Sequence, residues 1–160
     1  MVVNDFRQDL KYSYKDKILN TLYKNKCNVK YIQVITDLQK QKQGIDKVLY
    51  FNNGKSITID EKKRRRDYGD MLIETTKNVE LNKKGWIYYT KADYIVYWIE
   101  GSRSVYFINF KKLQRLYLKN QITWNMNYKI PPVYNKYYTT QNIAVPWHEI
   151  RSSIERVIKY

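Results

Sequence analysis

The sequence has 160 residues, and its 43% hydrophobic and 28% charged residues are typical of one globular domain with its own core. No apolar run approaches the roughly 20 residues that a transmembrane helix needs, and the polar N-terminus lacks the apolar centre of a signal peptide. Cys27 is the only cysteine, which excludes an internal disulfide and a cysteine-based zinc site. We therefore expect a cytoplasmic protein that does not enter a membrane.

Basic residues outnumber acidic residues two to one. Lys and Arg number 30, Asp and Glu number 15, and the net charge is +15. An AT-rich genome over-uses Lys codons, but it does not disfavour Asp or Glu, so codon bias alone does not explain this excess. A positive field attracts polyanions. Because the basic residues are spread along the chain and not gathered on one amphipathic helix, we expect nucleic acid, and DNA first, as the partner.

The first 62 residues predict a helix, a strand, a loop and a β-hairpin. The helix has apolar residues at steps of four, the strand is rich in β-branched residues, and the loop is polar and rich in Gln. Two alternating runs joined by Asn52-Asn53-Gly54 form the hairpin. These elements are expected at residues 6–23, 28–35, 37–44 and 47–62.

The remaining residues predict a strand, a second hairpin across Gly101-Ser102, a short helix, a strand-like, tyrosine-rich connection and a last helix. Their expected ranges are 71–76, 92–110, 111–120, 121–145 and 146–158. This order predicts an α/β fold with a central mixed β-sheet flanked by helices. We expect a single domain over residues 1–160, with a core at about 5–110 and a helical, tyrosine-rich extension at about 111–160.

The second strand of the first hairpin ends in charged residues. Residues two apart share a face of a strand, so Asp60 and Lys62 point one way and Ile57, Ile59 and Glu61 point the other. The two isoleucines are expected to pack against a helix. Asp60 and Lys62 would then turn together towards the open face, and Glu61 would be separated from them.

The hairpin turn decides whether Asp46 joins Asp60. A two-residue turn at Asn53-Gly54 would place Asp46 opposite Glu61. A three-residue turn that also includes Asn52, with its glycine in the left-handed conformation, would place Asp46 opposite Asp60. We predict the three-residue turn, because a metal site requires the two aspartates to converge.

Two converging carboxylates beside an ammonium group suit phosphodiester hydrolysis. Mg²⁺ and Mn²⁺ bind one or two carboxylates, waters and the phosphate of the substrate. Repulsion between Asp46 and Asp60 favours binding of such a cation, which polarises the phosphate and lowers the pKa of a bound water. Lys62 would orient or deprotonate the attacking water, or neutralise charge that develops on the phosphorane.

Asp46, thirteen intervening residues and Asp60-Glu61-Lys62 resemble the core motif of the PD-(D/E)XK nuclease superfamily, which includes restriction-endonuclease-like and Holliday-junction-resolvase-like enzymes. In that family a helix precedes a hairpin that carries Asp and then Asp/Glu-x-Lys. The resemblance implies a restriction-endonuclease-like core with Asp46, Asp60 and Lys62 as catalytic residues. Ile45 stands where the motif name has Pro. The following run KKRRRDYGDMLIE resembles a subgroup found in phages and mobile elements.

Many members of this superfamily add an acidic residue from the first helix. Asp16 is the best-placed residue of this kind, and Asp9 comes second. Glu74, on the next predicted strand, is the alternative third metal ligand. The motif leaves the choice among these residues open.

Four basic residues, Lys63, Arg64, Arg65 and Arg66, follow Lys62 directly. They are expected to contact phosphates beside the scissile bond, and such binding weakens as salt rises. The alternative is a solvated loop whose arginines pair with nearby acidic residues. A second mixture of basic and aromatic residues that can contact nucleic acid consists of Tyr128, Lys129, Tyr134, Lys136, Tyr137 and Tyr138.

The sequence therefore predicts an endonuclease-type phosphodiesterase that uses Mg²⁺ or Mn²⁺ and hydrolyses DNA. One alternative is a non-catalytic nucleic-acid-binding module. Another is a mobile-element protein that binds a host protein and inhibits a host defence complex. The resemblance also allows a homodimer, because cutting a duplex requires two strands to be hydrolysed.

Overall fold

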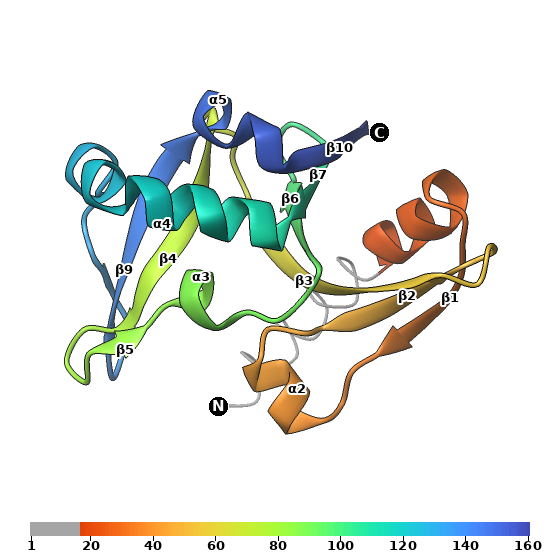
Figure 1. Ribbon diagram of the computed structural model, residues 1–160, viewed down its shortest axis with the longest axis horizontal. Coiled ribbons are helices and arrows are strands. Elements are labelled where there is room, and N and C mark those ends of the chain that lie inside the picture. Colours follow the sequence, from red (N-terminus) through yellow and green to blue (C-terminus); the bar gives the residue numbers. More distant parts are fainter. Residues whose placement is uncertain (1–16) are drawn as a thin grey trace.

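Two β-sheets organise the part of the chain that the structure describes, residues 17–160 of the computed structural model (Figure 1). Over these residues, sheet A has six strands in the order β1-β2-β3-β6-β7-β10, and sheet B has four in the order β5-β4-β9-β8. Sheet A consists of β1 (Val29–Val34), β2 (Lys47–Phe51), β3 (Ser56–Arg64), β6 (Tyr94–Ile99), β7 (Ser104–Asn109) and β10 (Ile154–Lys159). Sheet B consists of β5 (Lys83–Lys84), β4 (Asp70–Asn78), β9 (Thr139–Pro146) and β8 (Val133–Tyr134).

Helices flank these sheets. Residues 17–26 are helical and pack on one face of sheet A, whereas α4 (Phe110–Asn127) packs in the cluster that includes sheet B (Figure 1). The predicted α/β class, with a mixed sheet flanked by helices, is confirmed. In the described part of the chain, no helix is long and apolar enough to cross a membrane. The short helical segments are α2 (Leu38–Lys42), α3 (Trp86–Tyr89), α5 (Trp147–Ile150) and the 3₁₀ turn Arg151–Ser153.

Sheet A is mixed because β3 and β6 are parallel, whereas its other neighbouring strands are antiparallel. Parallel neighbours need a long connection, and residues 65–93 supply it. This connection contains β4, β5 and α3, so it forms half of sheet B. The segment expected as an extension then completes both sheets: β9 pairs with β4, and β10 pairs with β7.

Sheet A separates two hydrophobic clusters. On β3, Ile59 belongs to the cluster under the helical residues 17–26, and the neighbouring Asp60 and Lys62 point to the opposite side. The helix-side cluster includes Leu19, Tyr23, Leu49, Val96 and Trp98. The cluster between sheet A, sheet B and α4 includes Met71, Ile73, Ile95, Leu113, Trp124 and Val145.

The structure agrees, over the residues that it describes, with the helix predicted at 6–23 and differs from the loop predicted at 37–44. Residues 17–26 are helical, in agreement with the helix predicted at 6–23 as far as the structure describes it. The loop predicted at 37–44 is wrong, because it contains α2. Asp37 caps this helix by accepting a hydrogen bond from the Gln39 N–H at 2.8 Å. α2 buries none of its residues, so it lacks the apolar spacing by which a helix is recognised in a sequence.

The helix predicted at 146–158 is also wrong. The helical structure ends after α5 and the 3₁₀ turn, and the chain continues as the strand β10. Ile154 and Ile158 have helical spacing, but they pair with Ile108 and Val105 of β7. β7 offers an edge whose backbone groups need partners, and this pairing overrides the local spacing.

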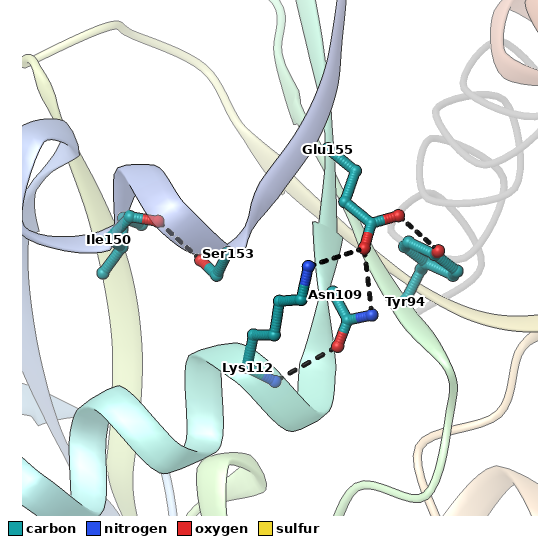
Figure 2. A network of polar contacts seen from close by, with 6 residues as sticks. All are labelled: Tyr94, Asn109, Lys112, Ile150, Ser153 and Glu155. Atoms are coloured by element: carbon teal, nitrogen blue, oxygen red, sulfur yellow. Dashed lines mark hydrogen bonds and ion pairs between the residues drawn. The ribbon is translucent and has the colours of Figure 1, made fainter.

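Polar side chains also hold β10 in place (Figure 2). The Glu155 carboxylate accepts hydrogen bonds from the Tyr94 hydroxyl at 2.5 Å, the Asn109 amide at 3.1 Å and the Lys112 ammonium at 3.3 Å. These three partners lie on β6, at the end of β7 and at the start of α4. The network therefore ties β10 to the elements that precede it by more than 40 residues.

Two further elements differ from expectation in length or in packing. The helix predicted at 111–120 is α4, which continues to Asn127 and buries Trp124. The connection at 121–145 contains the strand β9, in agreement with its expected strand-like character, but Ile143 and Val145 of β9 are buried against β4 in a second sheet. Both differences arise because sheet B, which was not foreseen, provides a surface for these residues to cover.

The β2–β3 hairpin has the predicted three-residue turn. The Phe51 N–H donates to the Lys55 carbonyl at 2.8 Å, so residues 52–54 form the turn. Gly54 has a φ of +82°, in the left-handed region. The strands pair with Lys47 opposite Ile59, which fixes the register of everything beyond the turn.

Replacing Gly54 tests this turn. No atom lies within 4 Å of the position that a Cβ would take, so the Gly54→Ala variant changes only the backbone preference. A left-handed non-glycine residue costs about 1–2 kcal/mol, and we expect the free energy of unfolding in urea to fall by about that amount. Lys55→Ala, in the same hairpin, is the control and should change little. Equal stability of the two variants would contradict a left-handed turn at residue 54.

Candidate active site

The side chains of Asp46 and Asp60 meet just beyond the last paired residues of β2 and β3, since, besides burial, the charge of Asp46 and a side-chain hydrogen bond with it both raise the pKa of Asp60. The last paired residues of the ladder are Lys47 and Ile59, which directly neighbour Asp46 and Asp60 in the chain. The Asp46 N–H donates to the Ile59 carbonyl at 2.9 Å, whereas the Asp46 carbonyl accepts the Ile35 N–H at 2.9 Å, so the backbone of Asp46 departs from the regular ladder. The Asp46 carboxylate in turn accepts the Glu61 N–H at 2.8 Å, which fixes its orientation. The predicted convergence of the two aspartates is therefore present.

Asp60 is buried at the floor of the site. It is 3% exposed, and the hydroxyl of Thr90 lies 3.5 Å from its Oδ2 atom. Gly44 closes over the same oxygen: its φ is +67°, and a Cβ there would lie 3.1 Å from Oδ2 and 2.7 Å from the Thr90 hydroxyl. The expectation that Asp60 faces an open surface is therefore wrong, because residues 44 and 90 from neighbouring loops cover it.

Lys62 connects this buried carboxylate to solvent. Its ammonium group lies 3.0 Å from Asp60 Oδ1, and its side chain is 29% exposed. The ring of Trp86 on α3 lies 5.3 Å from the same nitrogen, a cation–π contact that positions it from the other side. Asp60 and Lys62 share a face of β3, as the alternation of the strand predicts.

Burial dominates the electrostatics of Asp60. It raises the pKa of the carboxyl from its usual 3.8 to about 6, opposed by the charge of Lys62 and reinforced by the charge of Asp46. Ionised Asp60 is therefore unfavourable near neutral pH, because it is buried beside Asp46. A bound cation would offset this free-energy cost.

The proposed third carboxylate is not joined to the pair. Glu74 comes from β4 of sheet B and accepts the Trp86 N–H at 3.3 Å. Glu74 and Asp60 both raise the pKa of Tyr89, which burial has already raised, to about 12. Among residues 17–160, no three Asp, Glu, His or Cys side chains form a group that could hold a metal ion. Asp16 and Asp9 lie outside the described residues.

Glu61 belongs to a different site on the helix side of β3. Its carboxylate accepts hydrogen bonds from the Tyr23 hydroxyl at 2.7 Å and the Lys47 ammonium at 2.9 Å. Lys47 also donates to Asn20 at 3.1 Å, and both Lys47 and Glu61 are buried. This polar cluster links helix 17–26 to the hairpin. Lys47 was not expected at a buried position, although its alternation with Leu49 along β2 indicates that it points inward.

The basic run after Lys62 does not form one surface. Lys63 points to the helix side, where its ammonium lies 3.2 Å from Glu100 and 4.9 Å from the Trp98 ring. Arg64 forms an ion pair with Asp70 and lies 4.6 Å from the Tyr68 ring. The alternative in which an arginine pairs with a nearby acidic residue therefore holds for this position.

Arg65 and Arg66 follow the end of β3 and are exposed. Five residues of extended chain separate Asp60 from Arg65, or about 17 Å at the rise of a strand. Contact with a phosphate beside the scissile bond therefore stays a prediction, and this separation favours contact with a more distant phosphate.

Comparison with known proteins finds no relative. The chain matches no family model, no curated protein and no solved structure. The function is therefore argued from the geometry of the site.

The raised pKa of Asp60 predicts a pH-dependent effect on stability. Between about pH 4 and pH 6 the folded chain keeps a proton on Asp60 that the unfolded chain has lost. This favours the folded state at low pH, and the advantage disappears as pH rises through 6. The difference of roughly two pH units corresponds to at most about 3 kcal/mol.

Asp60→Asn removes this titration. Relative to wild type, the free energy of unfolding of the variant should therefore rise by up to about 3 kcal/mol from pH 4 to pH 7.5, measured in urea with a chelator present. Asp37→Asn makes the same chemical change at an exposed helix cap and serves as the control. A difference between Asp60→Asn and wild type that does not change with pH would show that Asp60 is not buried as described.

Proposed function

We propose that this protein is a nuclease that uses Mg²⁺ or Mn²⁺ to hydrolyse DNA phosphodiester bonds. The observation that carries this proposal is the convergence of Asp46 and Asp60, with the Lys62 ammonium 3.0 Å from Asp60. The net charge of +15 supports a polyanionic substrate. Asp60 is covered, but Asp46 is half-buried and Lys62 is partly exposed, so a phosphate can approach the site beside these two residues.

The order of elements supports a restriction-endonuclease-like core. Helical residues 17–26 precede the strands β1, β2 and β3. Asp46 stands just before β2, and Asp60 and Lys62 lie within β3. This is the arrangement that the resemblance to PD-(D/E)XK nucleases requires: a helix, then a hairpin that carries one aspartate on each strand and a lysine two residues after the second.

The residues at the site fit a hard divalent cation. Asp46 and Asp60 offer carboxylate oxygens, the ligands that Mg²⁺ and Mn²⁺ prefer, and such ions complete their coordination with water and substrate phosphate. The cost of ionising Asp60 next to Asp46 is a second sign of fit, because a cation would offset it. When bound, the ion would polarise the phosphate and lower the pKa of a coordinated water.

Lys62 would act on the attacking water and on the phosphate. Asp60 and the Trp86 ring hold its ammonium group in position, so it can orient the attacking water and stabilise the negative charge that develops on the phosphate. Asp46 keeps its orientation through the Glu61 N–H, so the hairpin backbone itself positions the first carboxylate.

Cleavage assays with matched variants test the proposal. Linear duplex, branched and single-stranded DNA should be cut in the presence of Mg²⁺ or Mn²⁺ and left intact with a chelator. Asp60→Asn and Lys62→Ala should each lower the cleavage rate by about 100-fold or more, because each removes a group that acts on the reacting atoms.

The controls make the same chemical changes elsewhere. Asp37→Asn removes an exposed carboxylate, and Lys24→Ala removes an exposed ammonium on the helical segment 17–26. Both should cleave like wild type. Equal cleavage by all five proteins would identify a contaminating nuclease and would refute the proposal.

A non-catalytic nucleic-acid-binding module is the second candidate. It is favoured by the ion pair between Lys62 and Asp60 and by the absence of a third metal-ligating side chain from the described residues. This candidate predicts salt-sensitive DNA binding that needs no metal and no cleavage under any of these conditions. Cleavage that is lost in Asp60→Asn would exclude it.

A further inference from the structure

One end of sheet B brings two turns together. The turn after β4 and the β8–β9 hairpin lie side by side (Figure 1). The Val79 N–H donates to the Thr139 carbonyl at 2.9 Å, and the Glu80 carboxylate accepts the Thr139 N–H at 2.9 Å. We call residues 79–84 and 133–138 the sheet B tip.

The sheet B tip exposes aromatic side chains to an unusual degree. Tyr134 and Tyr137 are each 80% exposed, and Leu81 is 64% exposed. Tyr138 and Val133, neighbours of these tyrosines in the chain, are also exposed. Rings at such positions stabilise the fold very little, and contiguous exposed apolar groups commonly mark a surface of interaction.

The charge around these rings selects the partner. The Lys136 ammonium lies 5.0 Å from the Tyr137 ring, and Lys83 and Lys84 are exposed on β5. No Asp or Glu occurs in the sequence between Glu100 and Glu149, a stretch that supplies α4, β8 and β9. Within the tip, Glu80 is the one acidic residue, and it is bonded to Thr139, so a surface of tyrosines and lysines fits a ligand that has flat rings and negative charge.

Unpaired nucleotides have both properties. Their bases stack on tyrosine rings and their phosphates attract lysines, whereas a duplex hides the faces of its bases. A protein partner with an acidic, apolar surface is the other class that this tip can attract, but it does not need several exposed rings beside the lysines.

Further cation–π contacts lead from the tip towards the candidate active site. Lys84 lies 5.0 Å from the ring of Tyr88, and Lys77 lies 5.8 Å from the ring of Tyr89. Tyr89 is close enough to Asp60 for its pKa to respond to that carboxylate. Along β4, the four steps from Glu74 to Asn78 span about 13 Å. A single DNA strand that leaves the candidate active site over α3 would therefore reach the sheet B tip within a few nucleotides.

We propose that the sheet B tip binds unpaired nucleotides of the substrate by stacking on Tyr134 and Tyr137. Resting on the proposed nuclease function, this assigns the substrate class as DNA with a single-stranded segment next to the scissile bond. Lys77, Lys84 and Lys136 hold the phosphates of that segment.

Binding to DNA without metal tests this proposal separately from cleavage. The probes are a labelled thymidine oligonucleotide of about 12 nucleotides, within the site size of stacking proteins, and a blunt duplex of the same length, both titrated by fluorescence anisotropy with a chelator. The Tyr134→Leu/Tyr137→Leu double variant should bind the oligonucleotide at least about tenfold more weakly than wild type, because it loses stacking on two bases. Its affinity for the duplex should change less than about twofold.

Two pairs of substitutions serve as controls, and Lys136→Ala tests the contact between this lysine and a phosphate. Tyr31→Leu/Tyr50→Leu removes two exposed tyrosines from β1 and β2 of sheet A and should bind both probes like wild type. Tyr134→Phe/Tyr137→Phe keeps both rings and should retain binding to the oligonucleotide. Lys136→Ala should reduce the slope of log affinity against log salt by about 0.7, the value for one lost contact with a single strand.

Unchanged affinity of the leucine double variant for the oligonucleotide would overturn the proposal and would leave a protein partner for the tip. An equal loss on both probes would also overturn it, because stacking on unpaired bases would then not be the cause. Neither result depends on cleavage. A protein that binds as expected but never cuts DNA would refute the nuclease function alone.

Discussion

The register of one hairpin determines whether the side chains of Asp46 and Asp60 meet. The left-handed Gly54 closes a three-residue turn, and the ladder of β2 and β3 carries that register to Lys47 and Ile59, the chain neighbours of Asp46 and Asp60. A turn shorter by one residue would place Asp46 opposite Glu61, on the face of β3 that packs against helix 17–26. The candidate active site therefore depends on a backbone conformation at a turn that takes no part in the chemistry.

Alternation along β3 then divides its charged residues between two environments. Asp60 and Lys62 face α3 and sheet B, whereas Glu61 and Lys63 face the other way and are held by Tyr23, Lys47 and Glu100. Each side of the strand has its own polar cluster within a mostly apolar surrounding. The raised pKa of Asp60 follows from this placement, since the cover that shapes the site also removes water from its carboxylate.

Local patterns were sufficient for the hairpin and its charged faces, because turn chemistry and alternation act between neighbours in sequence. They were insufficient where distant segments decide the outcome. Ile154 and Ile158 have helical spacing, yet they pair with β7, and the strand-like, tyrosine-rich connection joins a second sheet because β4 lies beside β9. The cover over Asp60 from Thr90 and Gly44, and the distance of Arg65 from the site, likewise depend on the path of residues 65–93 and not on the motif.

Anomalous scattering from Mn²⁺ in a crystal of the wild-type protein would test the central claim most directly. If Asp46 and Asp60 form a metal site, a peak should lie between the two carboxylates, and Asp60→Asn crystals soaked in the same way should lose it. Wild-type crystals that show no peak at saturating Mn²⁺, with Lys62 still paired to Asp60, would contradict the account.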